Sequence, residues 1–297
     1  MKFQSFAAAA VFIGASVGVV SCGGSTASSS TIPGLQRALD TQGDSRCGTK
    51  PGTPELIALM DRDLATIGAT RAGGTVTIPV YVHVVTNNGV GNVTNSQITR
   101  QIDVLNRSFD GRSGGPRTRF TFRHVATQRL SNPAWHAADL DTPEEREMKT
   151  ALHRGDAGTL NLYITEGDGE TLGFATFPND YARDPLMDGV VLKFDTLPGG
   201  TNVPYNLGDT APHEVGHWLG LFHTFENGCT NPGDGVGDTP AEADRAAGCP
   251  RGQDTCPSPG KDPIENFMNY TADSCMYKFS NGQVTRMSLA WDRYRAR

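Results

Sequence analysis

Apolar and polar residues alternate between positions 75 and 85, where most side chains are β-branched, and this pattern predicts a β-strand. Residues 94–109 follow a helical period instead, with Thr94 placed to cap the helix. A second helical period covers residues 142–155. Further strand patterns cover residues 119–130, 159–165, 172–178 and 189–195. Strands that alternate with helices predict a layered α/β fold.

The pattern changes after Phe225. Glycine, proline, aspartate and cysteine then dominate irregular stretches, until residues 280–297 resume a helical period. We therefore expect an upper subdomain built on a sheet and a lower, irregular subdomain held by disulfide bonds.

The first 21 residues place one lysine before an apolar stretch that is short and rich in alanine and glycine, which predicts a secretory signal peptide. Cys22 follows this stretch, so a lipidated cysteine and cleavage without a lipid both remain open. Residues 23–34 are rich in glycine, serine and threonine, as flexible linkers are. A helical pattern at 54–67 lies within the segment that follows. We interpret residues 22–73 as a linker and pro-region and residues 74–297 as the main domain.

Composition narrows the classes of partner. The chain of 297 residues is 37% hydrophobic and has a formal net charge of −6 with no long basic run, which argues against nucleic-acid binding. Membrane contact is expected only through a lipid on Cys22, and we expect a monomer. Export implies an oxidising compartment, in which the four cysteines between positions 229 and 275 can pair in three ways. Cys47 is then left alone.

A motif between positions 213 and 223 carries the chemistry. His213 and His217 are four residues apart, so on a helix they project from one face and can bind one metal ion. In an unbroken helix His223 would lie about 15 Å from His213, which is too far for a shared ion. We therefore expect the helix to stop at Gly220, where a left-handed conformation returns His223 to the metal.

Three histidines leave a coordination position of zinc open for water, and Glu214 lies beside it. Structural zinc sites usually close all four positions with protein ligands, so this arrangement indicates catalysis. Zinc would acidify the water and Glu214 would act as the general base for its attack on a carbonyl carbon.

The sequence HEVGHWLGLFH at 213–223 resembles the elongated zinc-binding motif of the metzincin endopeptidases. Together with GDGVGDTPAE and DPIENFMNYTADSC further on, it is most similar to the pappalysin family. The resemblance implies a metzincin-like fold with an upper mixed sheet and a cleft. It also implies that Met268 lies in a turn beneath the zinc and that Tyr270 hydrogen-bonds the oxyanion. For Tyr270 a buried structural role is an equal alternative.

Three further expectations follow from the resemblance. It implies the crossed disulfides Cys229–Cys256 and Cys249–Cys275. It also implies calcium near Asp234 and Thr239, although an ordinary surface loop is the alternative. Finally, pappalysin-like zymogens use a pro-region cysteine as a switch, so Cys47 is expected to bind zinc in the precursor. An intermolecular disulfide and a merely buried thiol are the competing interpretations of Cys47.

These expectations describe a secreted zinc endopeptidase that is made as a zymogen and cleaves proteins or peptides. The alternative is a secreted, non-catalytic binding or adhesion module on the same scaffold. Glu214 favours the enzyme, because a binding module needs no base beside an open metal position. Sequence alone does not assign the peptide specificity.

Overall fold

The computed structural model describes residues 46–67 and 74–296, all of which belong to one unit of the chain, residues 44–297. The predicted signal peptide, Cys22 and the linker lie outside the described residues. Among the described residues, no helix is long and apolar enough to cross a membrane.

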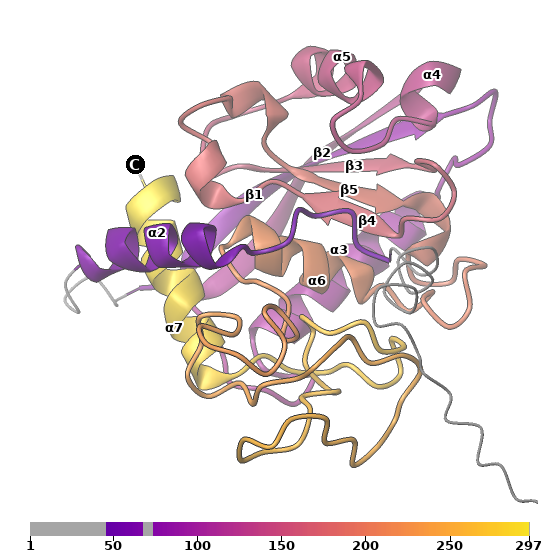
Figure 1. Ribbon diagram of the computed structural model, residues 1–297. Coiled ribbons are helices and arrows are strands. Elements are labelled where there is room, and N and C mark those ends of the chain that lie inside the picture. The colour runs from indigo at the N-terminus through magenta and orange to yellow at the C-terminus, as the bar shows by residue number, and fades with distance from the viewer. Residues whose placement is uncertain (1–45, 68–73, 297) are drawn as a thin grey trace, which may run out of the picture. The chain divides into compact units, whose positions relative to one another are not determined.

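A mixed sheet of five strands forms the centre of this unit (Figure 1). The strands are β1 (Val76–Thr86), β2 (Phe120–Ser131), β3 (Leu160–Thr165), β4 (Gly173–Ala175) and β5 (Val190–Lys193). They are ordered β2-β1-β3-β5-β4, and only β4, at one edge, is antiparallel to its neighbour. Strand β3 is buried along its whole length, because helices cover both faces of the sheet.

Helices α3 (Asn95–Phe109) and α6 (Thr210–Trp218) cover one face of the sheet (Figure 1). Helix α3 begins where the sequence predicts, since Thr94 and Gln97 form a reciprocal capping box. Ile98 of α3 and Val215 of α6 share one buried core with β1. The sheet thus fixes the position of α6, which carries the histidine motif.

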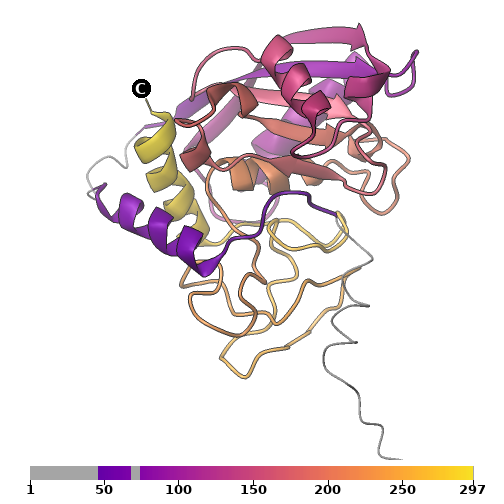
Figure 2. The ribbon, with the colours of Figure 1, turned by 45° about the horizontal axis from the view of Figure 1, so that its top comes forward.

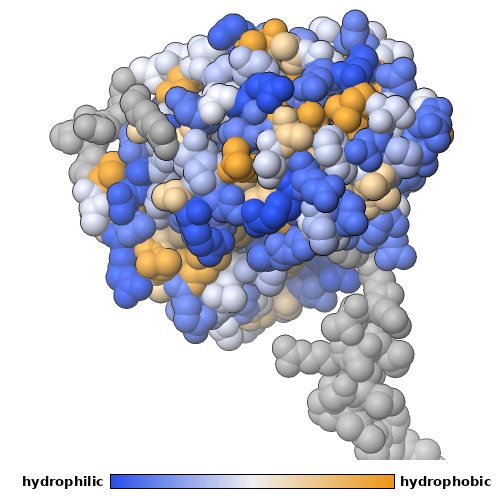
Figure 3. Space-filling view, turned by 90° about the horizontal axis from the view of Figure 1, so that it is seen from above, coloured by the Kyte–Doolittle hydropathy of each residue, from blue (hydrophilic) through white to orange (hydrophobic). Residues whose placement is uncertain are grey.

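Helices α4 (Pro133–His136) and α5 (Pro143–Leu152) lie on the opposite face. Met148 and Leu152 of α5 pack against Tyr163 and Phe174 in a second core. Seen from this side, the surface is mainly hydrophilic, with hydrophobic residues scattered in small groups (Figure 3). Such a surface is ordinary for helices that bury one side only.

The predicted strand over 172–178 is too long. Strand β4 ends at Ala175, and a 3₁₀ helix begins at Pro178, which has no N–H to donate to a ladder. Two further 3₁₀ helices cover Pro185–Met187 and Phe194–Thr196. The α/β fold itself is confirmed.

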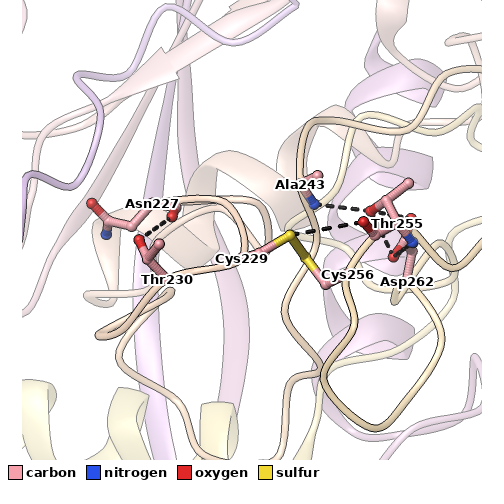
Figure 4. The surroundings of a disulfide bond; sticks show 7 residues. All are labelled: Asn227, Cys229, Thr230, Ala243, Thr255, Cys256 and Asp262. Carbon is pink, nitrogen blue, oxygen red and sulfur yellow. Dashed lines mark hydrogen bonds between the residues drawn. A yellow bond between two sulfur atoms is a disulfide. The ribbon is translucent and has the colours of Figure 1, made fainter.

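Residues 219–280 contain neither helix nor strand, as expected for the lower subdomain. Disulfides Cys229–Cys256 and Cys249–Cys275 cross-link them, and these are the two pairs that the family resemblance implies. Figure 4 shows the first pair, beside the hydrogen-bonded Thr255 and Asp262. Each bond closes a loop of about 27 residues and stabilises the fold by about 3–4 kcal/mol in the chain-entropy account.

The C-terminal helix α7 (Asn281–Ala290) continues as a π-helical turn at Trp291–Arg295. Helix α2 (Pro54–Ala65), from the predicted pro-region, lies beside α7 (Figures 1 and 2). Its Ile57 and Met60 are buried against Phe177 and Phe222. The predicted pro-helix is therefore docked on the main domain.

Candidate metal centre and active site

Helix α6 carries two of the three histidines of the motif. His213 and His217 project from one face of the helix, and their Nε2 atoms lie 3.2 Å apart. The chain then turns at Gly220, whose φ is +95°. The N–H of Leu221 donates back to the carbonyl of Gly216, which completes a Schellman-type helix end. This is the local conformation that the sequence analysis expects at Gly220.

The turn brings His223 to the other two rings. Its Nε2 lies 3.1 Å from the Nε2 of His217, and all three imidazoles are buried. Nitrogen ligands at 2.0–2.1 Å from a tetrahedral zinc ion are separated by about 3.3 Å. The observed separations therefore fit one zinc ion between the three rings.

Each imidazole is oriented through its Nδ1 atom. His213 donates to the carbonyl oxygen of Phe267 at 2.6 Å. His217 donates to the carbonyl oxygen of Leu221 at 2.8 Å, and His223 donates to the carboxylate of Glu226 at 3.0 Å. With Nδ1 donating, each Nε2 presents a lone pair toward the other two. Lone pairs in such proximity repel one another, so the donor set favours a cation between them. Burial, and next the nearby His223, lower the pKa of His213 to about 3, which leaves this imidazole in the neutral form that binds metals.

Glu214 lies next to this group and is fully buried. Its Oε2 accepts a hydrogen bond from Thr49 at 2.9 Å and lies 3.5 Å from the Sγ of Cys47. Its Oε1 is buried without a hydrogen-bond partner among the described residues. Burial raises the pKa of Glu214 to about 8, and the bonds from Cys47 and Thr49 lower it. A carboxylate whose pKa lies near neutrality is suited to accept and return a proton.

Met268 lies directly beneath α6. It is fully buried, and a Cβ added to Gly216 would lie 2.4 Å from its sulfur, so the glycine makes room for it. The carbonyl of Met268 accepts the N–H of Thr224, and the preceding carbonyl accepts His213. The turn around Met268 therefore supports the helix and one imidazole together.

Cys47, from the predicted pro-region, reaches the same centre. Its Sγ and one nitrogen of each of the three histidines lie within 4.8 Å of one another. Within the described ranges, no other group of three or more His, Cys, Asp or Glu side chains is arranged to hold a metal. Burial, and then the charge of Glu214, raise the pKa of the Cys47 thiol, whereas a metal cation has the opposite effect.

The chain around Cys47 lies along strand β4. Cys47 forms a parallel bridge with Gly173, and the N–H of Gly48 donates to the carbonyl of Gly173 at 2.9 Å. The N–H of Leu172 donates to the carbonyl of Arg46 at 2.8 Å. The segment thus occupies the edge of the sheet next to the three histidines.

The side chain of Arg46 lines a pocket beside Glu214. The guanidinium lies 4.2 Å from the centre of the Tyr205 ring and donates to the carbonyl of Tyr270. Asp273 also lines the pocket, with a buried Oδ1 that has no hydrogen-bond partner in the described part of the chain. Burial raises the pKa of Asp273 to about 6, and the hydrogen bonds from backbone amides and the charge of Arg46 lower it.

Comparison with known proteins decides the family. The peptidase family described as pregnancy-associated plasma protein-A matches residues 150–292. An extracellular metalloprotease of Neurospora crassa is 39% identical over 275 residues, which are 88% of this chain and 93% of that protein. One of Colletotrichum graminicola is 41% identical over 239 residues, 78% of this chain and 82% of that protein. The chain belongs to the pappalysin family.

Solved structures agree with this assignment. Mature mirolysin of Tannerella forsythia in complex with a cleaved peptide is 29% identical, with a TM-score of 0.65 over 75% of this chain and 96% of that one. A promirolysin mutant is 28% identical, with a TM-score of 0.71 over 84% of this chain and 94% of that one. The pappalysin described here is a metalloendopeptidase, and the alternative of a non-catalytic module is not supported.

The loop expected to bind calcium in this pappalysin brings Asp234 and Thr239 together. The hydroxyl of Thr239 donates to both carboxylate oxygens of Asp234, at 2.9 and 2.8 Å, and the N–H of Val236 donates to one of them. Burial raises the pKa of Asp234 to about 7, and the hydrogen bond from Thr239 lowers it. The loop lines a cavity of about 690 Å³.

Sequence reasoning missed several residues of the site. Glu226 orients His223, Thr49 bonds Glu214, and Tyr205 and Asp273 line the pocket of Arg46. Glu226 lies three residues after a ligand, and this spacing is the one sequence signal that could have indicated it. The others come from segments far apart along the chain, and no local pattern marks them.

Proposed function

We propose that this pappalysin is exported as a latent precursor in which His213, His217 and His223 hold zinc. The observation that carries the proposal is the convergence of three oriented imidazoles on one point beside a buried glutamate. The relatives named extracellular metalloproteases support export, since their identity to this chain extends over most of both proteins.

When bound, zinc supplies Lewis acidity, which polarises a peptide carbonyl and acidifies a water molecule. Glu214 takes a proton from the attacking water and passes it to the leaving amine. Removal of the pro-segment frees its Oε2 from Thr49 and Cys47. The carboxylate then faces the cleft with both oxygens available.

Tyr270 is suited to stabilise the oxygen of the attacked carbonyl. In the precursor its hydroxyl donates to the carbonyl oxygen of Cys47 at 3.3 Å. Its ring packs at 5.0 Å from the ring of His223, which fixes its position beside the metal centre. A chain carbonyl lying in the cleft is therefore within reach of this hydroxyl, as an oxyanion donor requires.

The place that the Arg46 guanidinium takes in the precursor, against Tyr205 and Tyr270, would accept a basic side chain of the substrate. A cation there meets the face of Tyr205, the carbonyl of Tyr270 and the buried Asp273. Such a side chain gains charge-assisted hydrogen bonds that an apolar one of the same length does not form. Arg46 thus indicates a preference for arginine or lysine on one side of the cleaved bond.

Sequencing the peptides released from a denatured protein mixture tests the proposed function. We expect zinc-dependent cleavage, blocked by a chelator, with arginine and lysine enriched on one side of the cleaved bonds.

A peptide with arginine beside the cleaved bond should exceed its norleucine counterpart about tenfold or more in kcat/KM. The Tyr205→Leu enzyme should lose a factor of about 2–5 of this preference. Equal cleavage beside basic and apolar residues would contradict the assignment of the pocket.

Calcium binding by the Asp234 loop is the second part of the proposal. The pKa of Asp234 is near 7 in the folded chain, above the value of about 3.9 for a free aspartate. Without calcium, the free energy of unfolding should therefore fall as the pH rises from about 4 to about 7, because only the unfolded chain ionises readily there. Calcium binds the ionised form, so its stabilising effect should be complete above about pH 7.

Thermal unfolding at pH 8 checks this. Calcium at about 100 times its Kd should raise the Tm by about 5–10 °C, and Asp234→Ala should abolish the gain. Asp254→Ala, which changes an exposed aspartate of the same subdomain, should keep it. A Tm that does not respond to calcium in the parent protein would remove this part of the proposal.

A further inference from the structure

Two buried arginines of the C-terminal segment bind the carbonyl groups at the end of α6. Arg286 of α7 donates its Nε to the carbonyl of Gly220 at 2.9 Å. Arg295, in the π-helical turn, donates its Nε to the carbonyl of Trp218 at 2.9 Å. The last carbonyls of a helix have no partner within it and carry the negative end of its dipole, so cationic donors are favoured there. The end of the histidine-bearing helix is thus held from outside.

Arg295 belongs to a closed, fully buried network. Its guanidinium lies 3.5 Å from the centre of the Trp218 ring and makes two bonds to Asp188, at 3.0 and 3.1 Å. Asp188 in turn accepts the indole N–H of Trp218 at 2.9 Å. Breaking a buried ion pair of this kind destabilises the whole fold. Arg295 therefore serves the stability of the molecule as well as the helix end.

Arg286 contacts the turn itself. Besides its bond to Gly220, its guanidinium lies 5.1 Å from the centre of the Phe222 ring. Gly220 and Phe222 are two of the five residues that join His217 to His223. Phe222 and His223 are consecutive residues, so any movement of this turn also displaces the imidazole of His223.

We propose that Arg286 is a positioning residue that holds the turn between His217 and His223, and with it the third imidazole, in the geometry that binds zinc. This inference rests on the proposed zinc ligands. A single guanidinium fixes the carbonyl of the left-handed glycine and the face of the neighbouring ring. Its helix α7 begins beyond the lower subdomain, so the metal centre depends on the C-terminal segment for its shape.

The pro-segment binds the same guanidinium at another atom. Asp61 of α2 accepts from Nη1 of Arg286 at 2.5 Å, whereas the bond to Gly220 uses Nε. The Asp61→Asn variant therefore weakens a partner of Arg286 and leaves the bond to the turn in place. It separates the role of Arg286 in the metal centre from its role in docking the pro-segment.

The test uses the full chain with Arg286→Lys, which keeps the positive charge and loses the Nε bond. We expect zinc to pass to a chelator about 10–100 times faster than from the parent. In the zinc-free protein, amide exchange should accelerate at Leu219, Gly220 and Leu221 while β1 keeps its protection. The exchange measurement needs neither zinc nor activity, so it remains informative even where the zinc assignment fails.

Two matched variants serve as controls. Asp61→Asn and Arg129→Lys, the latter a β2 arginine that donates to the carbonyl of Val93 at 2.6 Å, should release zinc like the parent. Phe222→Leu removes the ring under the guanidinium, together with its packing on the pro-helix, and keeps the Nε bond to Gly220. It should shift both readouts by a smaller factor, which keeps the proposal testable where Arg286→Lys does not fold. Parent-like zinc release and exchange in Arg286→Lys would overturn the proposal, as would acceleration in β1 equal to that in the turn.

Discussion

Replacing Glu214 by glutamine in the enzyme freed of its pro-segment is expected to lower kcat by about 10²- to 10⁴-fold. Glutamine has the shape of glutamate and cannot accept the proton of the attacking water. The three imidazoles are held by Phe267, Leu221 and Glu226, none of which the change touches. Zinc content should therefore stay at one ion per chain, as measured by elemental analysis of the dialysed variant.

Glu226→Gln is the matched control, because it makes the same chemical change in the same site. Glu226 accepts a hydrogen bond from Nδ1 of His223 and has no expected part in proton transfer. Its loss should weaken zinc binding by about 10–100-fold and leave most of kcat once zinc is saturating. Full activity of Glu214→Gln would remove the general-base mechanism, and loss of zinc from it would make Glu214 a ligand instead.

The Cys47→Ala precursor is expected to cleave peptides before any processing, whereas the parent precursor is latent. Among the His, Cys, Asp and Glu side chains of the described pro-segment residues, only Cys47 is grouped with the three histidines, and its removal opens the fourth metal position to water. Peptide hydrolysis by the intact precursor, with processing blocked by short assay times and checked by mass spectrometry, measures this. The increase should reach at least about 10²-fold, because a general base then stands beside a metal position that is open to water.

The competing explanation is that the pro-segment blocks the cleft by its bulk. The structure gives that explanation concrete contacts, since Arg46 lies against Tyr205 and Tyr270, Thr49 donates to Glu214 and α2 is docked on α7. Should Cys47→Ala be as latent as the parent, these contacts and not the thiol maintain latency. Adding Arg46→Ala to the same precursor would then be expected to release activity.

Much of the fold could be predicted because each element has a local signature. The alternation at 75–85 gave β1 to within one residue, and the capping residue Thr94 fixed the start of α3. The helix stop at Gly220 followed from a distance argument about His223, which the observed φ of +95° satisfies. Strand β4 was predicted too long, since periodicity does not register the missing N–H of Pro178.

The remaining parts of the site depend on contacts between distant segments. Asp273 lies in the pocket of Arg46, which is more than 200 residues away along the chain, and Arg286 binds Gly220 across 66 residues. Neither pairing leaves a periodic signal in the sequence. The sequence indicated which residues carry the chemistry, whereas the residues that orient them became apparent only in three dimensions.

X-ray absorption at the zinc edge of the full-length precursor tests the central claim most directly. Zinc held by His213, His217, His223 and Cys47 predicts three nitrogen neighbours at about 2.0–2.1 Å and one sulfur at about 2.3 Å. After removal of the pro-segment, the sulfur should be replaced by an oxygen neighbour while the three nitrogens remain. A precursor whose zinc has no sulfur neighbour, or fewer than three imidazoles, would contradict the account.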